Sequence, residues 1–267
     1  MKIQSINTNN YSFQARRKEI RRADDIVRNV NKNFPAFSTT YAEEFWFYLK
    51  KFKKGYTDKR IYNKHKELGE IRKNLNTKDM EETLFKKVKE KKVGNCGEKS
   101  YLTLGALSAN GIKNFTRRYD VGIKWSATDL RTGERVFEDI QDFDHNIVVS
   151  TMTNEKPKRN NDLIVIDGWL NKAMSYSEAQ AKYKAMIKED FLSETQQTAI
   201  IKFIDASKKD YGLLGKKLPY DFDINNYEFE HNIVFYIPPK TRYHIISDEF
   251  DKLGEIVTEK YPELVLA

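Results

Sequence analysis

Apolar residues recur every three or four positions through most of the first ninety residues, with polar and charged residues between them. This spacing is typical of amphipathic helices, because 3.6 residues complete one helical turn. It predicts helices at 16–32, 40–54, 58–75 and 77–90. Residues 1–15 are rich in Asn, Ser, Thr and Gln, and we expect them to be flexible. The N-terminal third is therefore predicted to be mainly helical.

The pattern changes near residue 95. A helix is expected at 97–109, with Gly111 as its C-terminal stop. Short apolar runs and a Thr132-Gly133 turn then predict strands at 117–125, 135–141, 145–151 and 163–167. Helical sequence from 175 to 209, a strand at 231–237 and a helix at 247–260 complete the chain. The strand connections are too short for parallel crossovers, so we predict an α+β fold with an antiparallel sheet.

Composition narrows the class of protein. The chain has 267 residues, of which 39% are hydrophobic and 13% aromatic, which argues against a disordered protein. The single cysteine, Cys96, excludes a disulfide scaffold and a cysteine-cluster metal site. No motif for a metal or a nucleotide is present, so no cofactor is expected. Without a long apolar run or a Sec-type signal peptide, we expect a soluble protein in a reducing compartment, cytoplasmic or exported by a non-Sec route.

Charge is unevenly distributed. Residues 1–95 hold 24 basic and 12 acidic residues, whereas residues 96–267 hold 23 and 27. We therefore expect a flexible N-terminus (1–15), a basic helical region (16–92) and a core region (93–267). The basic region could bind an acidic protein, a nucleic acid or an anionic lipid surface. Solvated Lys and Arg on helix surfaces are the simpler interpretation.

Three segments carry residues suited to chemistry: 93–112, 143–150 and 163–169. Cys96 stands between short, flexible residues at the predicted start of a helix, where unpaired N–H groups and the helix dipole stabilise a thiolate. His145 opens an apolar strand, and Asp167 ends another. A thiol needs a base, and the base needs a group that orients its ring. Neighbouring antiparallel strands can bring the histidine and the aspartate side by side.

A second histidine could act as the base, and Asp167 has an alternative role. His231 lies in Phe229–Phe235, which nearly repeats Phe143–Val149, so either histidine could be the base. Asp167 favours His145, because no acid follows His231 until Asp248. Asp167 could instead only end a strand, since Asp-Gly is a strong turn signal.

These segments resemble the papain-like and transglutaminase-like thiol enzymes, above all bacterial effector or toxin domains of that superfamily. The resemblance covers residues 93–175, under a third of the chain, and rests on Gly94-Asn95-Cys96-Gly97-Glu98, Asp144-His145 and Ile166-Asp167-Gly168-Trp169. It implies a Cys-bearing helix packed on an antiparallel sheet, with Cys96 as nucleophile, His145 as base and Asp167 as orienter. Papain itself has Gln before the cysteine, and region 77–95 has none. Asn95 or the backbone of Cys96 would supply the oxyanion donor, and Trp169 and His231 would line the site.

The resemblance thus implies a cysteine-dependent enzyme that attacks an amide carbonyl of a protein substrate, as a protease, a glutamine deamidase or a transglutaminase. The alternative is an inactive thiol-enzyme fold that serves as a binding module for an anionic partner.

Overall fold

The computed structural model describes residues 8–36, 59–73, 80–112, 115–153, 156–187, 189–208, 222–237 and 250–266. It confirms the α+β class. One five-stranded sheet has the order β4-β3-β2-β1-β5. Its strands are β1 (Arg117–Asp129), β2 (Arg135–Ser150), β3 (Ile164–Asp167), β4 (Lys172–Ser175) and β5 (Tyr227–Tyr236).

The described helices agree with the predicted ones apart from two differences. They are α1 (Thr8–Asn33), α3 (Lys59–Lys73), α4 (Met80–Lys91), α5 (Cys96–Ala109), α6 (Tyr176–Met186), α7 (Glu189–Lys208) and α8 (Phe250–Lys260). Helix α1 begins inside the segment 1–15 that was expected to be flexible, because no Gly or Pro interrupts the chain before Pro35. The helical sequence 175–209 is divided into α6 and α7. The helix expected at 40–54 lies outside the described residues.

Two of the expected strands are one. The predicted strands 135–141 and 145–151 form the continuous strand β2, since the polar residues between them remain extended. Strand β4, which sequence analysis did not predict, is a four-residue edge strand. It pairs antiparallel with β3, from Ile164 opposite Ser175 to Asp167 opposite Lys172. The apolar pattern of four residues is too short to predict this register.

The chain folds into two compact units. The first comprises residues 1–119, 146–179 and 239–267, and the second comprises 120–145 and 180–238. This division differs from the boundary expected from charge at residues 92 and 93, because α1, α4 and α5 share the first unit. Strands β1 and β2 each contribute residues to both units.

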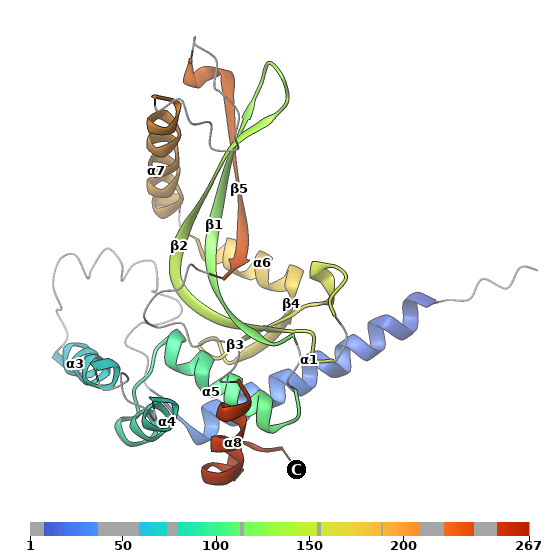
Figure 1. Ribbon diagram of the computed structural model, residues 1–267, viewed down its shortest axis with the longest axis vertical. Helices are drawn as coiled ribbons and strands as arrows, with labels where there is room; N and C mark the ends of the chain where they lie inside the picture. The colour runs from blue at the N-terminus through green and yellow to red at the C-terminus, as the bar shows by residue number, and fades with distance from the viewer. Residues whose placement is uncertain are drawn as a thin grey trace, which may run out of the picture. The chain divides into compact units, whose positions relative to one another are not determined.

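The first unit has its core around α5. Helices α1 and α8 both lie against α5, and β3 and β4 lie beside α1 (Figure 1). Buried side chains from these elements form one apolar cluster, which includes Val27, Leu102, Leu107, Ile166 and Val257. Burial of such side chains is the main stabilising term in folding.

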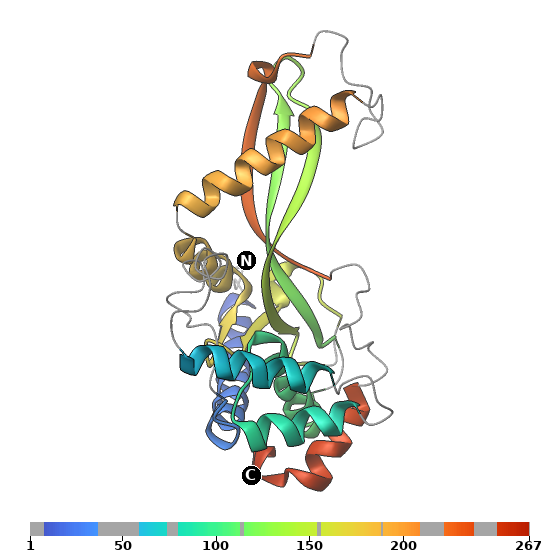
Figure 2. The same cartoon turned by 90° about the vertical axis from the view of Figure 1, so that its left-hand side faces the viewer.

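The second unit contains three strands and α7. Strands β1 and β5 pair antiparallel from Asp120 opposite Tyr236 to Asp129 opposite Tyr227. Helix α7 lies obliquely across the strands (Figure 2). Phe203 of α7 meets Phe137 of β2 and Tyr227 and Phe229 of β5, with ring centroids 5.0 to 5.7 Å apart. None of the described helices has the length and apolar composition that a bilayer crossing requires.

Candidate functional site

Cys96 is the first residue of α5, and its side chain is partly exposed. The preceding residue, Asn95, has extended dihedral angles (φ −92°, ψ −166°) and is the N-cap. The Asn95 backbone N–H donates to Glu98 Oε2 at 2.9 Å, which is half of a capping box. This capping fixes the start of the helix at Cys96, one residue before the start predicted from the sequence.

The Glu98 carboxylate is also bound by an arginine. Arg72 of α3 donates from Nε to Oε1 at 2.8 Å and from Nη2 to Oε2 at 3.3 Å. The negative charge near Cys96 is therefore neutralised by a guanidinium and spread over two partners. Glu98 is 4% exposed, so this pair lies at the edge of the core.

Asp167, at the end of β3, is completely buried. Its Oδ1 accepts hydrogen bonds from the backbone N–H groups of Trp169 at 2.8 Å and Leu170 at 2.9 Å. This is the turn-forming role that the Asp-Gly signal indicated. The buried Trp169 follows in the same turn, which we call the β3–β4 turn (residues 168–171).

The β3–β4 turn packs directly on α5. A Cβ atom on Gly168 would lie 2.9 Å from Thr103 Oγ1 and 3.0 Å from the Lys99 carbonyl oxygen. Cys96, Lys99 and Thr103 are spaced three and four residues apart, so they share one side of α5. The turn that follows Asp167 therefore packs on the side of the helix that begins with Cys96.

Asn146 of β2 was not predicted as a site residue, yet it contacts the first turn of α5. A Cβ atom on Gly97 would lie 3.1 Å from Asn146 Oδ1. The available sequence signal was an amide directly before the apolar run Ile147–Val149. Glycine after the nucleophile candidate thus allows β2 to approach the helix closely.

Lys99, also missed from sequence, is 9% exposed beside the β3–β4 turn. Burial lowers the pKa of its ammonium group, and attraction to Asp167 opposes that change. A lysine inside a helix of small and apolar residues was the available signal.

The two candidate histidines belong to the second unit. His145 is 3% exposed, and its ring lies edge-on to Tyr183 of α6, with centroids 5.6 Å apart. His231 pairs with Trp125 across β1 and β5, and their ring centroids are 5.0 Å apart. Burial, and then repulsion from Lys184, lowers the pKa of His231. Cys96, Asn95, Asp167 and Trp169 belong to the first unit.

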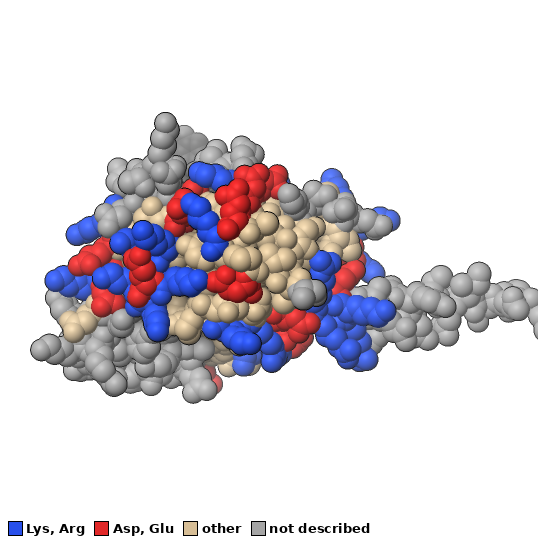
Figure 3. All heavy atoms as spheres, turned by 90° about the horizontal axis from the view of Figure 1, so that it is seen from below, with Lys and Arg blue, Asp and Glu red and all other residues tan. Residues whose placement is uncertain are grey.

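Some of the basic side chains of residues 16–92 form ion pairs within the first unit. Lys89 pairs with Glu263 at 2.7 Å, and Arg16 and Arg28 also have acidic partners. On the face drawn in Figure 3, acidic and basic side chains are interspersed. The described residues contain no group of His, Cys, Asp and Glu that could hold a metal ion.

Comparisons of the chain with models of known protein families, with curated proteins and with solved structures gave no match.

Proposed function

We propose that this protein is a cysteine-dependent enzyme with a papain-like or transglutaminase-like core, which attacks an amide carbonyl of a protein substrate. The observation that supports the proposal is the position of Cys96. It is a partly exposed thiol at the first position of a capped helix, and the turn that follows a buried aspartate packs on the same side of that helix.

A helix start is a favourable place for a thiolate. The first N–H groups of a helix have no helical carbonyl to bond, and the helix dipole places partial positive charge there. The same N–H groups can stabilise the oxyanion that forms during acyl transfer. Pairing of Glu98 with Arg72 reduces the electrostatic cost of a negative charge on Cys96.

The proposed reaction has two steps. His145 accepts the Cys96 proton, and the thiolate attacks the carbonyl carbon; the C–N bond then breaks, and His145 returns the proton to the leaving nitrogen. Water hydrolyses the thioester to a carboxylate, or a second amine captures the acyl group. Asp167 is proposed to orient His145, and His231 is the alternative base. By resemblance to effector and toxin domains, the substrate would be a protein, and the thiol would require a reducing compartment.

The alternative is a binding module for an anionic partner, and one observation favours it. The outer side of α1 exposes Arg17, Lys18, Arg21, Arg22 and Lys32, with Asp25 as the one acidic residue among the exposed positions of the described part of that helix. Such a surface attracts polyanions in a salt-dependent way. In this alternative Cys96 would have ordinary thiol reactivity.

The test is the rate of iodoacetamide alkylation between pH 5 and 9. Because Cys96 is the only thiol, every label is assigned without ambiguity. We expect fast labelling of the wild type at pH 6. Either His145→Ala or His231→Ala should reduce the alkylation rate at that pH by roughly tenfold or more, and the variant that does so identifies the base. Asp167→Asn keeps an Oδ1 acceptor for the turn and should reduce the rate less.

The opposite result would be a rate that follows an ordinary thiol, with half-maximal labelling near pH 8.5, and no change in either histidine variant. That result would contradict the enzyme proposal. Salt-sensitive binding of heparin to the wild type, weakened by Arg17→Ser with Arg21→Ser, would then support the binding module.

A further inference from the structure

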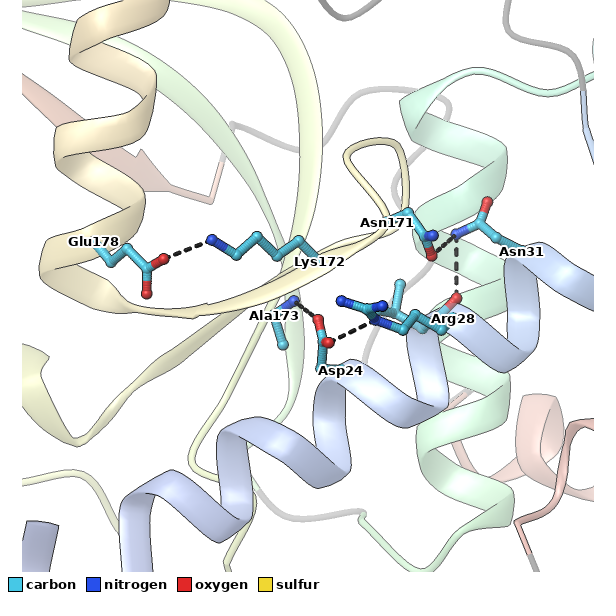
Figure 4. Close-up of polar contacts among 8 residues, drawn as sticks. Asp24, Arg28, Asn31, Asn171, Lys172, Ala173 and Glu178 are labelled. Atoms are coloured by element: carbon cyan, nitrogen blue, oxygen red, sulfur yellow. Dashed lines mark hydrogen bonds and ion pairs between the residues drawn. The ribbon is translucent and has the colours of Figure 1, made fainter. Parts of the chain in front are cut away.

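The two outer strands of the sheet, β4 and β5, differ in what their unpaired sides contact. At β4, helix α1 supplies a partner: Asp24 Oδ1 accepts a hydrogen bond from the Ala173 backbone N–H at 2.9 Å (Figure 4). Arg28 donates to the other oxygen of Asp24 at 2.7 Å, which holds the carboxylate in place. An N–H group that would otherwise be open to a further strand is thus bonded within the chain.

At β5, two hydrogen bonds show which backbone groups point away from β1. The Leu130 N–H donates to the carbonyl oxygen of Asn226 at 2.9 Å, and these two residues continue the β1–β5 register by one position. Because hydrogen-bonded and non-hydrogen-bonded pairs alternate in an antiparallel ladder, the even-numbered residues of β5 bond to β1 and the odd-numbered residues turn their N–H and C=O groups outward. Gln180 of α6 agrees with this assignment, since its Nε2 donates to the outward carbonyl oxygen of Ile233 at 2.8 Å.

The outward N–H and C=O groups of Phe229 and His231 make no hydrogen bond within the part of the chain that the structure describes. We call these four groups the open edge of β5. The strand around them is regular: its ten residues pair with β1 without a bulge and include no proline or lysine, which commonly protect an edge. The His231 ring packs against Trp125, directly opposite on β1, with ring centroids 5.0 Å apart. The open edge is thus held in an extended conformation that a further strand can join.

Two exposed carboxylates border the open edge. Side chains alternate along a strand, so Glu228 and Glu230 lie on one face of the sheet and Phe229 lies on the other. Neither glutamate forms an ion pair with any residue that the structure describes, and Lys124, on the same face of β1, pairs with Glu138 of β2 at 2.7 Å. A strand added at the open edge would place side chains about 4.5 to 5.5 Å from these glutamates, measured between Cβ atoms. Lys or Arg at those positions would form cross-strand ion pairs.

We propose that the open edge of β5 binds an extended segment of a partner polypeptide in which basic and apolar residues alternate. The segment exchanges two hydrogen bonds with Phe229 and two with His231. Its basic residues lie opposite Glu228 and Glu230, and its apolar residues lie on the face of Phe229. A second copy of β5 fits less well, because the register centred on Phe229 places the carboxylates of the two copies opposite each other. This interaction goes beyond the proposed enzyme and does not depend on the reactivity of Cys96.

The experiment uses the full chain and the fluorescent peptide Gly-Lys-Val-Lys-Val-Lys-Gly. Anisotropy measures the affinity, and NMR measures amide hydrogen exchange residue by residue. In the free protein, the N–H groups of Phe229 and His231 should exchange faster than that of Glu230, which bonds to β1. The peptide should slow exchange at Phe229 and His231 by roughly tenfold or more, with little change at Glu230. Unspecific attraction of a basic peptide would not select these two amides.

Matched controls separate the hydrogen bonds from the charge. Methylation of the valine nitrogens of the peptide removes the donors that face β5 and keeps the charge, so the affinity should fall roughly fivefold or more. Glu228→Gln combined with Glu230→Gln should also weaken binding, by roughly fivefold. Glu189→Gln combined with Glu194→Gln removes the same charge from exposed positions of α7 and should change the affinity by less than about twofold.

Three results would overturn the proposal: no binding, equal binding of a peptide with the same lysines and valines in separate blocks, or unchanged exchange at Phe229 and His231. Slow exchange of both amides in the free monomer would show that another part of the chain already bonds the edge, and would overturn it too. Slow exchange only at concentrations where sedimentation shows a dimer would assign the edge to a second copy instead. Alkylation of Cys96 tests the proposed enzyme separately, and neither result affects the other.

Discussion

Gly168 has a steric reason to be glycine that does not depend on its backbone angles. The position where a Cβ atom would lie is 3.0 Å from a backbone oxygen, that of Lys99, and 3.1 Å from the Lys99 Cβ atom. These atoms belong to a helix and cannot move away as the tip of a flexible side chain can. The contact between the β3–β4 turn and α5 therefore depends on the absence of one methyl group.

We predict that Gly168→Ala lowers the free energy of unfolding by about 1 to 3 kcal/mol, because the methyl group forces the turn away from α5. Urea unfolding followed by circular dichroism would measure this change. Gly69→Ala in α3 is the control, since nothing lies within 4 Å of its Cβ position. That substitution should stabilise the helix by up to about 1 kcal/mol. Equal effects of the two substitutions would contradict the proposed close contact.

At the scale of elements, α5 packs closely against α4 on one side and α8 on another. A Cβ atom on Gly105 would lie 2.7 Å from Phe85 Cζ of α4 and 3.0 Å from Val257 Cγ2 of α8. A Cβ atom on Gly254 of α8 would meet Ser108 of α5, at 2.7 Å from its Cβ. Small residues thus let α8 and α5 pack with little space between their backbones.

The Ser108 hydroxyl is an unfavourable feature of this contact. Its hydroxyl is buried and makes no hydrogen bond within the part of the chain that the structure describes. We predict that Ser108→Ala leaves stability unchanged or raises it by about 1 kcal/mol, because a buried unpaired hydroxyl is removed. Gly254→Ala should instead cost about 1 to 3 kcal/mol.

Chemical denaturation of the two single variants and the double variant would measure these effects. The clash with Ser108 Cβ remains when the hydroxyl is removed, so the double variant should still be less stable than the wild type. A destabilised Ser108→Ala would show that the hydroxyl has a partner in solution.

At the scale of the whole molecule, the two units differ in the sign of their net charge. The first unit has 36 basic and 23 acidic residues, and the second has 11 and 16. Within the first unit, ion pairs such as Lys252 with Glu81 at 2.8 Å offset part of the excess. In this pair the Lys252 side chain is half exposed, whereas the Glu81 side chain is buried.

Titration of tyrosines that are partly or fully buried should make the protein less stable in alkali. Burial raises the pKa of Tyr236, Tyr176 and Tyr261, and Asp142 and Asp120 raise that of Tyr236 further. Above about pH 10 the unfolded chain releases phenolic protons that the folded chain retains. The stability that is present below pH 10 is therefore lost as the pH rises.

We predict that Tyr236→Phe flattens this loss between pH 9 and 11, and urea unfolding at fixed pH values would show it. The lowered pKa of Lys99 acts in the opposite sense, adding stability as the pH rises towards about 10.4. Comparing two proteins that both contain Lys99 cancels that effect. Identical pH slopes in the wild type and the variant would exclude Tyr236 as a contributor.

Sequence by itself determined most of the elements and the fold class, because these follow from local rules. Periodicity located α3, α4, α5 and β1, and Gly111, with φ +78°, follows α5 as the expected stop. The start of α5 near Cys96 and the turn after Asp167 could also be predicted from the sequence, since each depends on residues no more than four positions apart. The active-site roles of Cys96, His145 and Asp167 stay predictions.

Tertiary structure decided what depends on residues distant in the chain. The edge strand β4 forms because β3 and α1 supply its partners, and its four residues carry too little pattern to predict it. The contact of Asn146 with Gly97 and the hydrogen bonds from Lys99 through Asn31 to the β3–β4 turn join residues 49 to 140 positions apart. No local pattern encodes such contacts, because they arise only when helices and strands bury their apolar faces against one another.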